Sequence, residues 1–178
     1  MARHTINISL SESSVNEAIR QLQQYKQSLK YKCELFVERL AELGDKAAIM
    51  SINESPLGRT VTLRVDRKPI RDGYKAILIA TGKTVEVEDR EPFYTLLAIE
   101  FGAGIHYNSN ANPKASEFNL GVGTYPGQVH AFQDTWYFWD EQSQSWMATH
   151  GVKATMPMYN ATMEIINQYK QIAREVFS

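Results

Sequence analysis

The stretch that decides the fold is residues 15–43, VNEAIRQLQQYKQSLKYKCELFVERLAEL. Its apolar side chains recur at intervals of three and four, at Val15, Ala18, Ile19, Leu22, Tyr25, Leu29, Cys33, Phe36, Val37, Leu40 and Leu43. This spacing, held over about eight turns, predicts an amphipathic helix. A 30-residue helix is about 45 Å long, which exceeds what a chain of this size needs to cover its own core. We therefore expect part of the helix to pack against another copy of the protein.

The ends of this helix are marked by short polar and glycine signals. Ser11 lies inside a hydrophobic-staple pattern, and Ser14 with Glu17 has the spacing of a capping box. Gly44 is placed where a C-terminal cap is expected. The pattern therefore predicts a helix that ends near Gly44, followed by a second, shorter helix over residues 45–53.

The middle of the chain is typical of antiparallel strands. Apolar residues alternate over 60–66 and again over 84–89. The unbroken apolar run from Ala76 to Ala80 predicts a central strand covered on both faces. Residues 93–101, FYTLLAIEF, are ambiguous between strand and short helix, and the glycines that follow favour a strand.

The last third combines a long loop, a hairpin and a helix. Residues 107–128 are rich in Asn, Ser, Gly and Pro, and a loop of that length is typical of a mobile or binding segment. Residues 135–151 predict an aromatic hairpin, and Pro157 opens a helical stripe that runs to the C-terminus. We predict a single α+β domain over 1–178, with the two long helices packed on a mostly antiparallel sheet.

Composition excludes several classes of protein. The net charge of -1 gives no overall field to attract nucleic acid or an anionic membrane. The single cysteine, Cys33, has no partner for an internal disulfide and falls on the apolar stripe. The sequence also lacks an apolar run of roughly 20 residues and a signal-peptide core. We expect a protein made and kept in the cytosol, with no membrane partner.

The residue patterns offer little for catalysis. The histidines are isolated and lack metal-ligand spacing: His4, His106, His130 and His150. No nucleophile elbow is present, and the glycines of GVGTYPG, residues 121–127, fit neither a dinucleotide fingerprint nor a phosphate loop. We therefore predict no catalytic residue, cofactor or metal, and interpret His150 as a local hydrogen-bonding residue.

Two charged segments are candidate interaction surfaces. The segment 59–75 is basic, and its interface candidates are Arg64, Arg67, Lys68 and Arg71. An acidic segment follows, with Glu86 and Glu88 as candidates. Three interpretations stay open: the charges pair within the sheet, they meet across a subunit boundary, or the basic patch lines a DNA channel.

The aromatic hairpin is a third candidate. Strand side chains alternate, so if Trp136 and Phe138 face the core, Tyr137 and Trp139 face outward. Outward aromatics are favoured anchors of protein interfaces. The alternative is a core layer on each side of the hairpin.

Several of these features together resemble the tail-completion, or neck, proteins of long-tailed bacteriophages. The order of a long helix, a β middle and a final helix is similar, and so are two short motifs. The acid-aromatic-Gly motif is matched by Glu100, Phe101 and Gly102, and the small residue and proline before the last helix by Ala154 and Pro157. The loop 107–128 and the hairpin are longer than in the family's shortest members.

The resemblance implies a structural, non-enzymatic virion protein without cofactors. Several copies, expected to be six, would form a ring between the tail tube and the head connector, around the DNA channel. Partners would be the tail terminator or tube and the connector, with assembly in the host cytoplasm. We expect the purified protein to be monomeric or weakly associated.

Three alternatives remain at this point. In the first, the protein is a tail terminator or another minor tail protein. In the second it is a surface hydrolase that uses Glu100 or the acidic segment with His106 or His150. In the third it is a glycan-binding module built on Trp139 and its neighbours.

Overall fold

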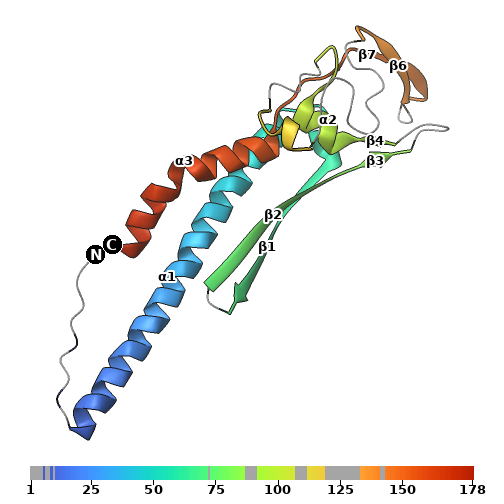
Figure 1. Cartoon of the computed structure of the whole chain (residues 1–178). Helices are drawn as coiled ribbons and strands as arrows, with labels where there is room; N and C mark the ends of the chain where they lie inside the picture. The colour runs from blue at the N-terminus through green and yellow to red at the C-terminus, as the bar shows by residue number, and fades with distance from the viewer. Residues whose placement is uncertain are drawn as a thin grey trace.

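A computed structural model describes residues 6, 9, 11–71, 73–86, 92–106, 112–118, 133–140 and 143–178. Figure 1 shows two long helices, an antiparallel hairpin beside them and smaller elements gathered at one end. The elements are α1 (Glu12–Asn53), η1 (Gly58–Thr60), β1 (Val61–Ile70), β2 (Gly73–Gly82), β3 (Thr84–Val85), β4 (Phe93–Tyr94), α2 (Thr95–Phe101), β5 (Ala103–Gly104), η3 (Ala115–Phe118), β6 (Trp136–Asp140), β7 (Ser145–Thr149), β8 (Gly151–Val152) and α3 (Pro157–Phe177). The predicted α+β class is confirmed.

Helix α1 is longer than the sequence pattern predicts. It is capped by Ser11, whose side chain accepts a hydrogen bond from the Ser14 backbone, so Ser14 is not the cap. It then continues through Gly44 to Asn53 without a break, so the predicted cap at Gly44 and the separate second helix are both wrong. A helix of 42 residues is about 63 Å long.

Gly44 has a packing role instead of a capping role. It is buried, and a Cβ added there would lie 2.8 Å from Ile165 Cδ1 of α3 and 3.7 Å from Leu78 Cδ2 of β2. Glycine therefore lets α1 pass closely between α3 on one side and the β1–β2 hairpin on the other. This layered order is visible in Figure 1, and it explains why a helix-weakening residue lies inside α1.

Helix α3 runs antiparallel to α1 along the C-terminal half of α1. Ile165 lies near Gly44, and the ring centroids of Phe177 and Phe36 are 5.8 Å apart. Arg39 and Glu175 form an ion pair between the same two helices at 2.9 Å. Because α3 packs on α1, the layers follow the order β1–β2 hairpin, α1 and α3. The prediction that both helices pack on the sheet is wrong for α3.

The sheet predicted as one unit is divided into short antiparallel pairs. Among the described residues the pairs are β1–β2, β3–β4, β5–β8 and β6–β7. Within the described residues strand β2 pairs with β1 alone, from Val61 opposite Gly82 to Ile70 opposite Gly73. In this part of the chain it is therefore an edge strand, and Ile77 of its apolar run is exposed.

Residues 93–101 form a helix rather than the predicted strand. Only Phe93 and Tyr94 pair as β4, and α2 follows directly, with Gly102 at φ 81° as its C-cap. Because α2 is short and buried almost all round, its apolar residues show no helical periodicity in the sequence. Gly102, which favoured a strand in the sequence, therefore ends a helix instead.

The other predicted elements meet the structure in part. The aromatic hairpin is confirmed as β6–β7, and α3 begins at Pro157 as predicted. Within 84–89, Thr84 and Val85 are a strand, and residues 87–89 lie outside the described residues. Within the predicted loop 107–128, residues 112–118 are described and contain η3, and the rest lies outside the described residues. In the described part of the chain, no helix is long and apolar enough to cross a membrane.

Candidate functional site

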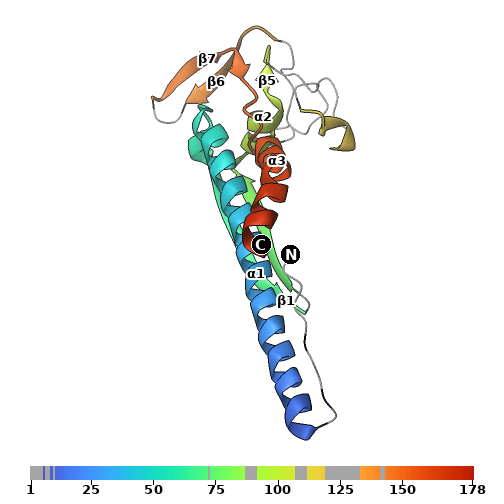
Figure 2. The ribbon, with the colours of Figure 1, turned by 90° about the vertical axis from the view of Figure 1, so that its left-hand side faces the viewer.

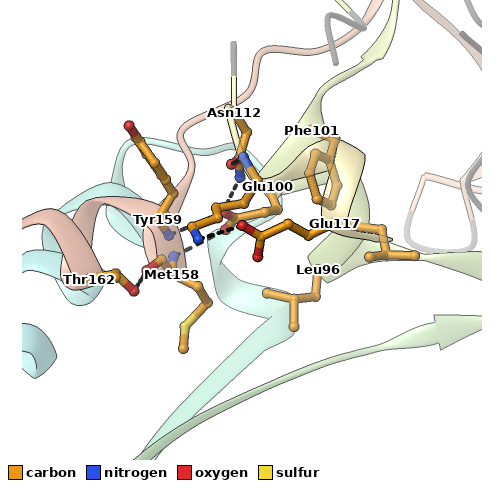
Figure 3. Close-up of a pocket in the computed structure, with 10 residues that line it drawn as sticks. Leu96, Glu100, Phe101, Asn112, Glu117, Met158, Tyr159 and Thr162 are labelled. Carbon is orange, nitrogen blue, oxygen red and sulfur yellow. Dashed lines mark hydrogen bonds and ion pairs between the residues drawn. The ribbon is translucent and has the colours of Figure 1, made fainter. Parts of the chain in front are cut away.

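The Glu100 carboxylate caps the start of α3, although it belongs to α2. Glu100 Oε2 accepts a hydrogen bond from the Met158 backbone N–H at 3.0 Å, and Oε1 accepts one from the Tyr159 backbone N–H at 3.1 Å. The Asn112 side-chain amide donates a third hydrogen bond to Oε1 at 2.7 Å. Figure 3 shows these groups converging on the carboxylate. We call this cluster of Glu100, Asn112, Met158 and Tyr159 the Glu100 joint.

The local sequence explains why α3 needs an external cap. The first backbone N–H groups of a helix have no partner inside it. Pro157 at the first helical position has no N–H, and the preceding Met156 is left-handed, at φ 50°, and its own side chain makes no capping hydrogen bond. A carboxylate there also interacts favourably with the positive end of the helix dipole. Glu100 therefore holds α3 against α2.

Backbone pairing ties the same two stretches together. The Ile99 carbonyl accepts hydrogen bonds from the Thr155 N–H at 2.9 Å and the Met156 N–H at 3.3 Å. Strand β5 pairs with β8, so Ala103 lies opposite Val152. The two short motifs of the sequence are therefore neighbours in space: Glu100, Phe101 and Gly102 on one side, with Ala154 and Pro157 on the other. Phe101, Gly102 and Pro157 are buried, and Ala154 is half-buried.

A pocket of about 440 Å³ opens beside the joint. It is lined by Leu96, Leu97, Glu100, Phe101, Asn112, Lys114, Glu117, Met158, Tyr159 and Thr162. Burial raises the pKa of the Glu100 carboxyl above its ordinary value, and the hydrogen bonds from Met158, Tyr159 and Asn112 oppose that increase. His106 and His150 are not part of this lining, so the pocket does not place a histidine beside Glu100.

His150 makes local hydrogen bonds, as the sequence predicts. Its Nδ1 lies 2.7 Å from the Asp134 carbonyl oxygen and 3.2 Å from Thr135 Oγ1. Its side chain is largely exposed. Among the described residues, no group of three or more His, Cys, Asp or Glu side chains has the arrangement of a metal site.

The basic candidates differ in their surroundings. Arg67 Nε donates to Glu38 Oε2 of α1 at 2.6 Å, and the Tyr74 hydroxyl donates to Glu38 Oε1 at 2.8 Å. Arg64 pairs with Asp66 of its own strand at 2.8 Å. Lys68 and Arg71 are exposed near the tip of the β1–β2 hairpin. The described part of the tip is therefore basic, and Arg67 instead holds the hairpin on α1.

Of the two acidic candidates, only Glu86 lies within the described residues. Glu86 is exposed, and within the described residues no ion pair joins it to segment 59–75. Glu88 lies outside the described residues. On the hairpin itself Lys68 lies opposite Lys75, so two cations face each other rather than an acid and a base. Pairing of the two segments across neighbouring strands is not what the described residues show.

We expect the Glu38 contact to give a pH-dependent part of the stability. The Tyr74 hydrogen bond and Arg67 lower the pKa of Glu38 below its ordinary value of 4.5. Its stabilisation is therefore present above pH 4.5 and is lost as the pH falls through the lowered pKa. Glu38→Gln should be less stable than wild type at pH 7, and the difference should shrink below about pH 4. Urea unfolding of both proteins across this pH range measures the difference in their free energies of unfolding. A difference that does not change with pH would contradict the prediction.

One face of the β6–β7 hairpin is an exposed aromatic surface. Trp139 lies opposite Trp146, and their rings form an edge-to-face pair with centroids 5.7 Å apart. Tyr137 and Trp146 are each 67% exposed, and Trp139 is 47% exposed. The expected outward direction of Tyr137 and Trp139 is confirmed, and their core-layer alternative is wrong. We call Tyr137, Trp139 and Trp146 the aromatic face.

A second exposed surface is carried by the N-terminal part of α1. Residues 12–30, here called the stalk, extend beyond the end of α3 (Figures 1 and 2). Five of their large apolar side chains are exposed: Val15, Ile19, Leu22, Tyr25 and Leu29. The sequence predicts such an unpartnered stretch from its length alone. What the prediction missed is its charge, because residues 20–32 contain four basic residues and no acidic one.

Comparisons with known proteins give no relative for this chain. No family model, curated protein or solved structure matches it.

Proposed function

We propose that this chain is a structural protein of the neck of a long-tailed phage or phage-like particle. In this proposal several copies, expected to be six, form a ring that completes the tail and joins it to the head connector. The protein is not an enzyme and uses no cofactor. The ring surrounds the DNA channel, and the basic tip around Lys68 and Arg71 is the surface suited to lie nearest the DNA.

The observation that best supports this proposal is the Glu100 joint. The motif positions that carry the family resemblance lie in one hydrogen-bonded unit, in which Glu100 of the first motif caps the helix that Pro157 of the second motif begins. A resemblance made of unrelated fragments gives no reason for such contact. The joint thus supports reading both motifs as parts of one fold signature.

The same geometry argues against a hydrolase built on Glu100. A general acid must transfer its proton to a substrate atom within hydrogen-bond reach. Both Glu100 oxygens accept hydrogen bonds from α3, and the side chain is buried, with 8% of the residue exposed. The carboxylate is therefore occupied by the fold, which favours a structural role for it.

Deletion of the gene from the encoding phage or prophage tests the proposal. We expect DNA-filled heads and tails of normal length that accumulate unjoined in electron micrographs. Wild-type protein supplied in trans should restore joined particles, and so should Tyr31→Ser, because this exposed side chain takes no part in the hydrogen bonds of the Glu100 joint.

Other phenotypes would contradict the proposal. Joined, infectious particles would remove the neck role altogether. Tails of uncontrolled length would instead place the protein at the tail terminator, and normal joined particles that fail only to adsorb would support the glycan-binding alternative.

A further inference from the structure

The stalk presents an apolar stripe that another helix covers further along α1. Leu22, Leu29 and Phe36 recur at intervals of seven on this stripe. At Phe36 the stripe is covered by Phe177 at the end of α3. Toward the N-terminus of α1 this cover is missing, and Leu22 is 55% exposed. A stripe that is half-buried against another helix at one end and exposed at the other has the pattern of an unoccupied interface.

Cations lie in and beside this stripe. Lys26 and Lys30 are exposed, and a shallow groove runs along the helix between them and the neighbouring glutamines Gln23 and Gln27. Among the described residues neither lysine has an ion-pair partner. The surface suited to the stalk is therefore apolar and negatively charged, and rich in aromatic rings that attract ammonium groups.

The β6–β7 hairpin has those properties. Its aromatic face is formed by Tyr137, Trp139 and Trp146. Residues 133–149 contain three acidic residues, Asp134, Asp140 and Glu141, and no lysine or arginine. A two-stranded hairpin is only marginally stable by itself, so packing its aromatic face on a helix would stabilise it.

The two surfaces lie at opposite ends of the molecule. Figures 1 and 2 both place β6 and β7 at the end remote from the start of α1. The hairpin therefore cannot reach the stalk of its own chain. We propose that the aromatic face of one copy docks on the stalk of the next copy, which makes the contact head-to-tail.

This inference rests on the proposed function, because repeated head-to-tail contacts close into a ring when the rotation permits. It names the two surfaces that would make the ring. Contacts between like surfaces are disfavoured, since two stalks would bring Lys26 and Lys30 against their own copies, and two hairpins would carry the same net negative charge, although Asp140 lies on the face opposite the aromatic face. Charge therefore selects the unlike pair.

Two complementary double variants test the contact in the full-length protein. The stalk variant carries Leu22→Ser and Leu29→Ser, with Tyr31→Ser as its matched control. Tyr31 is 65% exposed, against 55% for Leu22 and 40% for Leu29, and lies about 200° around the helix from Leu29. The hairpin variant carries Tyr137→Ser and Trp146→Thr. Its control, Met147→Thr, changes an exposed residue of the opposite hairpin face.

We expect wild type and both controls to self-associate weakly in sedimentation velocity, with a Kd on the order of 100 μM that weakens as salt is added. Each double variant alone should associate at least about tenfold more weakly. An equal mixture of the two should form one-to-one complexes, because one intact stalk and one intact hairpin remain. Circular dichroism of each variant checks that the helices are retained.

Several results would overturn the contact. Self-association of either double variant alone, at the strength of wild type, would show that the two surfaces do not pair with each other. An equal mixture that stays monomeric would contradict the contact, and so would wild-type protein that stays monomeric up to about 1 mM. These outcomes are separate from the gene-deletion result. If the deletion leaves heads and tails unjoined but the mixed variants form no complex, only this contact is wrong. If the mixed variants form a complex but the deletion leaves joined particles, only the proposed function is wrong.

Discussion

Glu100→Ala is expected to lower the free energy of unfolding by about 3 kcal/mol. The substitution leaves the N–H groups of Met158 and Tyr159 and the Asn112 amide without their acceptor, in a buried position. It also opens space between α2 and α3. For a chain of this length the midpoint of thermal unfolding should fall by about 6–12 °C, which calorimetry measures directly.

Two further variants locate the cause of that loss. Glu100→Gln keeps the size and one acceptor oxygen, so we expect an intermediate loss of about 1–2 kcal/mol. Glu117→Ala changes an exposed carboxylate of the same pocket that pairs only at the surface with Lys114, and should cost under about 0.5 kcal/mol. If Glu100→Ala and Glu117→Ala had equal effects, the carboxylate would not be the cap of α3.

Gly151→Ala should be at least as damaging, with a loss of about 3 kcal/mol or more. Gly151 has φ of 106°, which side-chain-bearing residues rarely adopt, and an added Cβ would overlap the carbonyl group of Ala103. The substitution therefore strains the backbone and separates β5 from β8, on which the approach of α3 to α2 depends. Urea unfolding at neutral pH measures the loss.

Gly73→Ala is the matched control for this prediction. Gly73 begins β2 at the hairpin turn, and the only described neighbour of an added Cβ is Ile70 Cγ1 at 4.0 Å. We expect a change within about 0.5 kcal/mol in either direction. Equal destabilisation by the two substitutions would show that glycine loss in general, and not the β5–β8 contact, is responsible.

The part of the fold predicted correctly follows from long periodic patterns. Helix α1, helix α3 and the hairpin β6–β7 each carry apolar residues at a period that one secondary structure explains. The failures arise where tertiary packing overrides a local signal. Gly44 stops a helix in isolation, but between α3 and β2 its lack of a side chain is what allows α1 to continue.

The candidate site was predictable only in outline. The sequence identifies Glu100 and Pro157 as motif positions, but their separation of more than fifty residues hides that one caps the other's helix. The aromatic face was predictable because strand side chains alternate. The stalk was predictable from length, whereas the proposed pairing of the stalk with the aromatic face depends on the position of the hairpin at the opposite end of the molecule (Figure 1).

A ring of such chains would use each part of the molecule for a separate task. The Glu100 joint sets the angle of α3, the α1 layer spans the molecule, and the stalk and aromatic face make the contacts between copies. In this arrangement a variant of the joint weakens the fold, whereas a variant of the stalk weakens assembly. Comparing stability with head–tail joining for Glu100→Ala and for the stalk variant separates the two effects.

The most direct measurement of the central proposal is localisation of the chain on intact particles. Particles carrying a short epitope at the C-terminus of this chain would be labelled with gold-conjugated antibody and viewed by electron microscopy. Ser178 is exposed at the end of α3 and suits such a tag. The account predicts label at the junction of head and tail. Label along the tail tube, at the distal tip or on the capsid surface would contradict it.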